Sequence, residues 1–233
     1  MNTSLRIGVV IPSAGKGKRF GSDIPKQFLL LHNVPVLIHT VRHFENSARI
    51  SDIVVVTSEE ELKRTRELLQ HYAITKVRDV VIGGKERQDS VFKGCNALLA
   101  YSPELILVHD SVRPCITHAL IEHLIAAWNL YGAVVPVLPV KETLGEIDST
   151  GMISNYSSRE HTRIIQTPQA FHTQVLYNAL ASAIEQQYYG TDESSIVHRL
   201  GASVFTIEGI AQNIKITTQE DFLQVEEFMK CNE

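Results

Sequence analysis

The sequence predicts an α/β protein with a mainly parallel central sheet. Short apolar runs rich in β-branched residues alternate with amphipathic stretches along the chain of 233 residues. The apolar runs lack the polar alternation of a half-exposed strand, as expected for strands covered on both faces. Alternating strands and helices favour parallel strands with helices on either side of the sheet. The length suits one domain, and we expect residues 1–233 to form it.

The individual elements follow from local patterns. Apolar residues spaced three and four apart predict helices within 89–101 and 117–131. The expected strands are short, apolar runs bounded by turn residues. These strands cover residues 6–12, 52–57, 79–84, 104–110, 132–140 and 203–209.

Two capping boxes predict where further helices begin. Ser58 and Glu61 have the spacing of such a box, in which each side chain accepts the other's backbone N–H. The helix that they open is expected to continue through the amphipathic residues that follow. Thr217 and Glu220 have the same spacing and open an expected C-terminal helix that ends near Met229.

Residues 141–166 interrupt the alternation of strands and helices. Turn residues occur at Gly145, at 148–151 and at 157–158, and the pieces between them are short and β-like. This pattern fits a hairpin arm that projects from the sheet. It fits an ordinary surface hairpin equally well, so the pattern leaves both open.

Composition and charge exclude several classes of function. The formal net charge is −4, so we expect no nucleic-acid or membrane partner. No apolar run reaches transmembrane length, and the first residues lack the apolar core of a signal peptide. Three cysteines without a CxxC spacing argue against a disulfide framework or a zinc ribbon. We therefore expect a cytoplasmic protein with reduced thiols.

The histidines do not indicate a metal centre. His39 and His43 are four residues apart, and His118 and His123 are five apart, but neither pair lies in an HExxH setting. We expect them to pack on helices or lie at the surface, and we expect no metal site built from protein ligands alone.

The segment 9–28, VVIPSAGKGKRFGSDIPKQF, places four basic residues in the loop after the first strand. Like charges repel, so a negative ligand is expected there. Neither a Walker loop nor a Rossmann fingerprint fits, because Phe20 stands where both require glycine when counted from Gly15. The alternative is a solvated basic loop. The position after the first strand, and the second anchor at residues 25–27, favour anion binding.

Other loops place polar residues at strand ends, where ligands bind in open α/β sheets. In GGKERQDSV, two glycines precede Arg87 and Ser90 at an expected helix start, which suits an anionic ligand. In LVHDSVRP, Asp110 ends a strand and suits magnesium or a ligand hydroxyl, although it could also cap the next turn. Lys215 precedes the last helix.

Taken together, these motifs resemble the 2-C-methyl-D-erythritol 4-phosphate cytidylyltransferase family, whose group includes relatives that use D-ribitol 5-phosphate. The resemblance covers residues 7–230 and rests on PSAGKGKRFGSDIPKQF, GGKERQDSV, HDSVRP, RIIQTPQAF, TDE and QNIKITTQEDF. It implies a Rossmann-like, glycosyltransferase-A-like nucleotidyltransferase fold. It also implies CTP and a polyol phosphate as substrates, Mg²⁺ as cofactor, and a homodimer in which each subunit lends an arm, here about residues 141–166, to its neighbour.

The resemblance also implies a role for individual residues. Catalytic roles fall on Arg19, Lys26, Arg159 and Lys215, with Arg19 and Lys26 stabilising the transition state. Nucleotide binding falls on Pro12, Ser13, Ala14, Gly15, Lys26, Gly83, Arg87, Ser90 and Asp110. Binding of the second substrate falls on Asp110, Arg113, Thr143, Arg159, Thr167 and Lys215.

This chain departs from the family pattern at two of these places. Arg163 stands where many members have tryptophan, and Ser13 replaces a common alanine. Arg163 and HDSVRP also resemble the ribitol-phosphate relatives, whereas TDE and NIKITT favour methylerythritol phosphate. A nucleotide-binding module without turnover is a further alternative, but it would not need both Arg19 and Lys26. A sugar-1-phosphate nucleotidyltransferase would not need HDSVRP.

Overall fold

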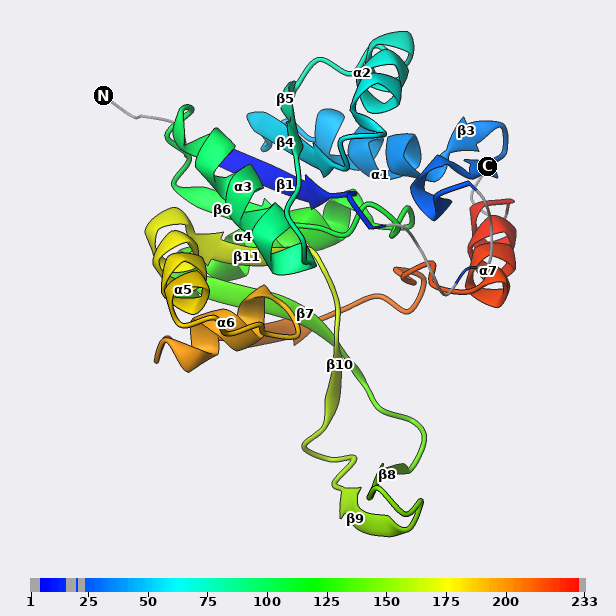
Figure 1. The fold of residues 1–233 in the computed structure, drawn as a ribbon, viewed down its shortest axis with the longest axis vertical. Coiled ribbons are helices and arrows are strands. Elements are labelled where there is room, and N and C mark those ends of the chain that lie inside the picture. Colours follow the sequence, from blue (N-terminus) through cyan, green and yellow to red (C-terminus); the bar gives the residue numbers. More distant parts are fainter. Residues whose placement is uncertain (1–4, 16–19, 21–23, 231–233) are drawn as a thin grey trace.

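The computed structural model describes residues 5–15, 20 and 24–230 (Figure 1). At its centre is an eight-stranded sheet in the order β10-β7-β11-β6-β1-β4-β5, with β12 paired to β7. Every expected strand is present, and the predicted strand 52–57 matches β4 end to end. The strands of the sheet are β1 Ile7–Pro12, β4 Asp52–Thr57, β5 Val77–Ile82, β6 Leu105–Val108, β7 Ala133–Pro139, β10 Arg163–Ile165, β11 Gln169–His172 and β12 Phe205–Glu208.

The sheet is mainly parallel but contains one reversed strand at its centre. The pairs β1–β4, β1–β6, β4–β5 and β7–β12 are parallel. Strand β11, which sequence reasoning missed, lies antiparallel between β6 and β7. The chain leaves the sheet after β7 and returns through β10, which is also antiparallel to β7, so it runs into β11 in the reversed direction.

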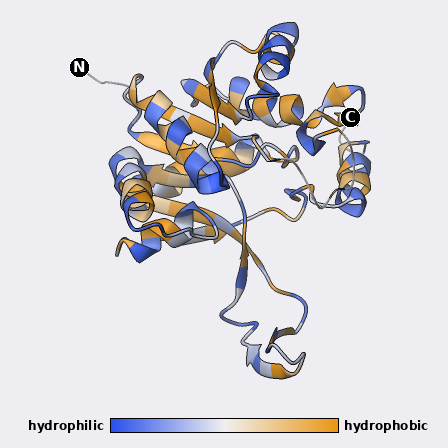
Figure 2. Cartoon of the chain, viewed as in Figure 1, coloured by the Kyte–Doolittle hydropathy of each residue, from blue (hydrophilic) through white to orange (hydrophobic). Residues whose placement is uncertain are grey.

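Helices cover both faces of the sheet, as predicted. Strands β1, β4 and β6 are buried along almost their whole length, and Figure 2 shows the apolar residues concentrated on the central strands. One apolar cluster joins the sheet to α1 Val36–Glu45, α2 Leu62–His71 and α4 His118–Tyr131. A second cluster joins the other face to α3 Arg87–Leu99, α5 Thr173–Glu185 and α6 Glu193–Arg199. Alternate residues of β1 enter the two clusters, which places them on opposite faces.

A smaller apolar cluster lies beside the carboxyl end of the sheet. It packs Phe20 and Ile216 against Val225 of α7 Gln219–Lys230. Further along the chain from Phe20 lie the 3-10 helix η1 Lys26–Phe28 and the two-stranded sheet of β2 Leu30–Leu31 and β3 Val34–Pro35. This cluster holds Phe20, Leu31 of β2 and the segment before α7 close together.

Residues 141–166 form an arm that projects from the body of the protein (Figure 1). Its hairpin pairs β8 Leu144–Ile147 with β9 Ile153–Ser157 in a separate two-stranded sheet. The projecting arm is therefore the better of the two interpretations that the sequence left open. Large apolar side chains on it are exposed, namely Leu144, Ile147, Met152, Ile153, Tyr156, Ile164 and Ile165.

Neither predicted capping box forms at the expected residues. Helix α2 begins at Leu62 after Glu61, whose side chain makes no cap hydrogen bond, and Ser58 lies in a turn whose carbonyl accepts the Glu61 N–H. That turn moves the helix start past Ser58, so the prediction was wrong.

At α7 the capping box is displaced by one residue. Thr218 Oγ1 accepts the Asp221 N–H at 3.2 Å, and Asp221 Oδ2 accepts the Thr218 N–H at 2.8 Å. The same Asp221 oxygen also accepts the Thr217 N–H, so this carboxylate satisfies two backbone donors. The predicted pair of Thr217 and Glu220 was therefore wrong by one position.

In the part of the chain that the structure describes, no helix combines the length and the apolar character needed to cross a membrane.

Candidate active site

A cavity of about 300 Å³ opens at the carboxyl ends of β1, β5 and β6. This is the edge of the sheet where ligands are expected in an open α/β fold. The cavity is lined by Pro12, Ser13, Ala14, Gly15, Lys26, Gln27, Gly84, Lys85, Glu86, Arg87, Ser90, Asp110, Ser111, Val112, Lys215 and Thr217. Most of the predicted nucleotide-binding residues are thus brought together from segments far apart in the sequence.

The first wall of the cavity is the loop after β1. The Ser13 N–H donates to the Val56 carbonyl at 2.6 Å, so the loop continues the pairing of β1 with β4. Buried Gln27 donates its amide to the Ser13 carbonyl at 2.8 Å, which attaches η1 to this loop. Lys26 of η1 donates to the Ile216 carbonyl at 2.8 Å. Gln27 had no predicted role, although its neighbour Lys26 did.

The second wall joins β5 to α3. Ser90 Oγ accepts the Gly84 N–H and donates to the Glu86 carbonyl, both at 3.1 Å. A capping box between Glu86 and Asp89 fixes the start of α3 at Arg87. Gly83 does not line the cavity but supports its wall, because a Cβ there would lie 2.6 Å from Ser90 Oγ and 2.9 Å from the Ala14 Cβ. Glycine lets the two walls approach each other closely.

Three cations converge on the buried carboxylate of Asp110. Arg87 Nε lies 3.1 Å from Oδ1, and Arg113 Nε and Lys215 Nζ lie 3.2 and 3.0 Å from Oδ2. Burial opposes ionisation of Asp110, but the three cations outweigh it and hold the pKa of this carboxyl well below its usual range. Asp110 is therefore ionised at neutral pH, and it fixes Arg87 and Lys215 where both line the cavity.

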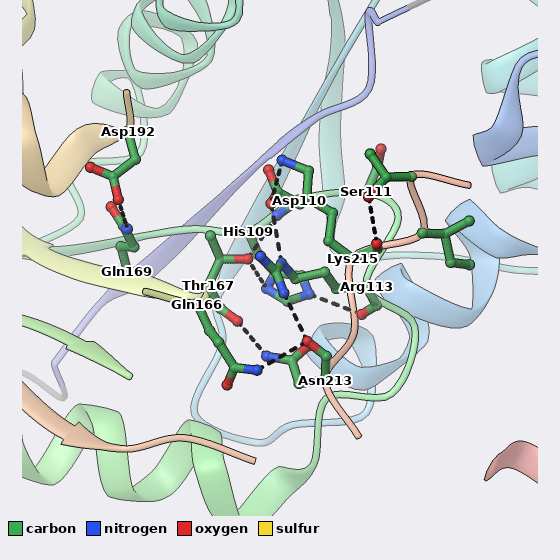
Figure 3. Close-up of polar contacts among 12 residues, drawn as sticks. His109, Asp110, Ser111, Arg113, Gln166, Thr167, Gln169, Asp192, Asn213 and Lys215 are labelled. Carbon is green, nitrogen blue, oxygen red and sulfur yellow. Dashed lines mark hydrogen bonds and ion pairs between the residues drawn. The ribbon is translucent and has the colours of Figure 1, made fainter. Parts of the chain in front are cut away.

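Behind Asp110, a buried histidine sets the local backbone (Figure 3). Burial lowers the pKa of His109 to about 3, so its ring is neutral at physiological pH. Its Nε2 lies 3.1 Å from the Arg113 carbonyl, which can only accept, so Nε2 carries the proton. Nδ1 therefore accepts from the Thr167 hydroxyl at 3.0 Å, and that hydroxyl oxygen accepts the Asp110 N–H at 3.2 Å.

A second set of contacts positions the segment that carries Lys215 (Figure 3). Asn213 donates to the Thr167 carbonyl at 2.7 Å, and its own carbonyl accepts from Arg113 Nη1 at 2.8 Å. The Gln166 amide donates to the same carbonyl at 3.2 Å. Sequence reasoning assigned no role to His109, Gln166 or Asn213, although each lies within a motif that it quoted.

Four further predicted residues lie away from the cavity lining. Arg113 and Thr167 are mostly or fully buried behind Asp110, where they support it. Thr143 and Arg159 are exposed on the arm, and Arg159 Nη1 donates to the Lys141 carbonyl at 3.3 Å. Arg19 lies outside the described residues. The substrate contacts expected of all five residues stay predictions.

The fold and this cationic cavity are those of a nucleotidyltransferase. This chain resembles two solved structures. One is 4-diphosphocytidyl-2C-methyl-D-erythritol synthase from Anaerococcus prevotii, and the other is 2-C-methyl-D-erythritol 4-phosphate cytidylyltransferase from Thermus thermophilus. The first has a TM-score of 0.85 and 26% identity and covers 97% of both chains. The second has a TM-score of 0.76 and 29% identity and covers 97% of this chain and all of the other.

The chain belongs to the 2-C-methyl-D-erythritol 4-phosphate cytidylyltransferase family, whose family model matches residues 7–231. A relative with that name from Syntrophus aciditrophicus is 36% identical over 229 residues, which are 98% of this chain and 97% of the relative. Another from Bacillus cereus is 40% identical over 223 residues, or 95% of this chain and 97% of the relative. The resemblance inferred from the motifs is confirmed.

Proposed function

We propose that the protein transfers CMP from CTP to 2-C-methyl-D-erythritol 4-phosphate, releasing pyrophosphate, in the non-mevalonate route to isoprenoids. The observation that carries this proposal is the convergence of Lys26, Arg87 and Lys215 on one cavity in a chain of this family. Arg87, Arg113 and Lys215 are paired with two carboxylates, Asp110 and Glu193, and Lys26 adds a further cation to the cavity, so an excess of positive charge remains that suits a triphosphate and a second phosphate.

In the proposed reaction, a phosphate oxygen of the polyol phosphate attacks the α-phosphorus of CTP in line. A phosphorus–oxygen bond to the polyol phosphate forms as the bond to pyrophosphate breaks. Catalysis of such a transfer consists mainly of positioning and charge stabilisation. Lys26, with Arg19, would stabilise charge on the α-phosphate and the leaving group, and Lys215 would position the reacting phosphates. The nucleophile is already an anion, so no general base is required.

Mg²⁺ fits this site as an ion held chiefly by phosphate oxygens. Within residues 5–15, 20 and 24–230, no group of three or more His, Cys, Asp or Glu residues is placed to bind a metal. Mg²⁺ commonly keeps several waters and takes substrate phosphates as ligands, and both oxygens of Asp110 already pair with cations, so the phosphates of CTP would supply most of its ligands here. When bound, the ion would offset negative charge on the phosphates and the departing pyrophosphate.

The proposed active form is a homodimer in which the arm of each subunit completes the site of its neighbour. The exposed apolar side chains of the arm support this, because a surface of this kind is usually buried in an interface. Arg163 Nη1 donates to the Glu160 and Thr162 carbonyls at 2.8 and 2.9 Å, which stabilises the turn beside Arg159. Arg163 thus has a local structural role at the position where many family members have tryptophan.

We also propose a cytoplasmic location. Buried Cys95 and half-buried Cys115 are free thiols, which suits a reducing compartment.

The D-ribitol 5-phosphate alternative is not favoured, because the matching family and the relatives described above are named for methylerythritol phosphate or its product. The deciding experiment measures pyrophosphate release from CTP and Mg²⁺ with each polyol phosphate in parallel. Release with methylerythritol phosphate alone is expected. Release with ribitol phosphate alone would replace the proposed substrate, and binding of CTP without release would indicate a nucleotide-binding module.

A further inference from the structure

Glu193, the first residue of α6, is fully buried and faces Arg87 of the cavity wall. Its Oε1 lies 2.7 Å from Arg87 Nη1. Its other oxygen, Oε2, has no hydrogen-bond partner among the described residues. A buried carboxylate is costly unless it is well paired, so the ion pair with Arg87 is the interaction that explains an acidic residue at this place. Sequence reasoning quoted residues 191–193 as a motif without assigning them a role.

The start of α6 is held rigidly against the sheet. Gln169 of β11 donates its amide to Asp192 Oδ2 at 2.7 Å (Figure 3). Its amide oxygen accepts the Ser194 N–H at 3.0 Å. Asp192 also caps the helix by accepting the Ser195 N–H at 2.9 Å. Gln169 therefore hydrogen-bonds to the residues on both sides of Glu193, and this fixes the direction of the Glu193 side chain.

The same segment is attached to the start of α3. Gln88, the neighbour of Arg87, donates to the Tyr188 carbonyl and accepts the Gly190 N–H, both at 2.9 Å. The loop before α6 therefore lies against the first turn of α3. Arg87 and Glu193 are held at a set separation by contacts that involve neither of their side chains.

Arg87 is held between two carboxylates from different elements. Its Nε donates to Asp110 and its Nη1 donates to Glu193, so these two pairs leave other guanidinium N–H groups for a ligand in the cavity. Without Glu193, the guanidinium would be free to turn and pair with both oxygens of Asp110. That geometry is favourable for arginine, but it would compete with Arg113 and Lys215 for Oδ2 and change the direction of the N–H groups that Arg87 offers to the cavity.

We propose that Glu193 is a positioning residue that holds Arg87 in the orientation that binds the phosphates or base of CTP. This inference rests on the proposed function, since CTP is the ligand assigned to the cavity.

The test measures the Kd of CTP with Mg²⁺ by calorimetry on the full chain, together with KM and kcat. Glu193→Ala is expected to raise the Kd and KM for CTP on the order of tenfold, with a smaller change in kcat. Glu193→Gln keeps an oxygen acceptor for Arg87, and its amide nitrogen replaces the unpartnered oxygen, so affinity should stay within about threefold of wild type. Should Glu193→Ala not fold, Glu193→Asp, which retracts the carboxylate by one methylene, is expected to weaken CTP binding instead.

Two controls separate positioning from a structural role. Asp52 is a buried acidic residue that, like Glu193, pairs with arginine, but it lies at the end of the strands opposite to the cavity. Asp52→Asn should therefore lower stability without changing the Kd of CTP. In an Arg87→Ala background, Glu193→Ala should have no further effect on the Kd. An unchanged Kd in Glu193→Ala, or additive effects in the double variant, would overturn the proposal. Because CTP binding is measured without the second substrate, failure of the proposed transfer reaction leaves this test intact.

Discussion

Replacing Gly83 with alanine tests whether the close approach of the two cavity walls is needed for nucleotide binding. The added Cβ would lie 2.6 Å from Ser90 Oγ and 2.9 Å from the Ala14 Cβ. Ordinary contacts of this kind are about 3.4–4 Å, so each neighbour must move by roughly 0.5–1 Å. Ser90 can rotate only by losing its hydrogen bonds to Gly84 and Glu86, and Ala14 can move only with its backbone.

The magnitude follows from these displacements. Losing two hydrogen bonds at about 0.5–1.5 kcal/mol each lowers the free energy of unfolding by about 1–3 kcal/mol. A displacement of about 1 Å in a binding loop is expected to lower kcat/KM for CTP on the order of a hundredfold. Urea unfolding and pyrophosphate release measure the two effects on the same preparation.

Two further variants sharpen this test. Gly15→Ala places its Cβ where no atom of residues 5–15, 20 and 24–230 lies within 4 Å, so its stability should equal that of the wild type. Adding Ser90→Ala to Gly83→Ala removes the closest contact. Gly83→Ala should therefore lower turnover less when it is introduced into Ser90→Ala than when it is introduced into the wild type. Wild-type stability and CTP kinetics in Gly83→Ala would refute the reasoning, because the walls would then tolerate a side chain between them.

Further predictions concern catalysis, assembly and stability. Lys26→Ala is expected to lower kcat on the order of a hundredfold while the Kd of CTP changes far less, measured by turnover and calorimetry; equal losses in both would contradict a transition-state role. Mixing inactive Lys26→Ala and Arg159→Ala proteins should restore some activity through mixed dimers, and no recovery despite proven subunit exchange would exclude arm exchange. Burial of Asp52 opposes ionisation, but hydrogen bonds from Arg6 and Arg78 outweigh it and lower the pKa of the Asp52 carboxyl. The stability that ionised Asp52 contributes is therefore present above its unfolded pKa of about 3.9, and it is lost as the pH falls through the lower pKa of the folded state. Asp52→Asn should therefore lower the Tm by about 3 °C at pH 7, and scanning calorimetry should show this difference narrowing below about pH 4; a constant difference would contradict the ion-pair account.

Local patterns in the sequence were sufficient for the elements that depend on local preferences. The apolar β-branched run 52–57 forms a strand with the predicted ends, since it fits a position covered on both faces whatever its neighbours. The glycines and basic residues after the strands correctly indicated the edge of the sheet that carries the cavity. The family resemblance added the identity of most lining residues, because motif spacing survives where overall identity is modest.

The tertiary structure alone decided how these elements combine. The reversed direction of β11 depends on the path of the arm. Ser58 does not cap α2, because it begins a turn that the spacing of Ser58 and Glu61 does not reveal. The cluster at Asp110 pairs residues far apart in the chain, and its arginine Arg87 also pairs with Glu193, which lies 106 positions away. Such contacts carry no local signature, because the free energy that selects them comes from burying and pairing charges only after the sheet has formed. The sequence by itself determined which strands, glycines and cations this protein has, and tertiary packing determined which of them meet.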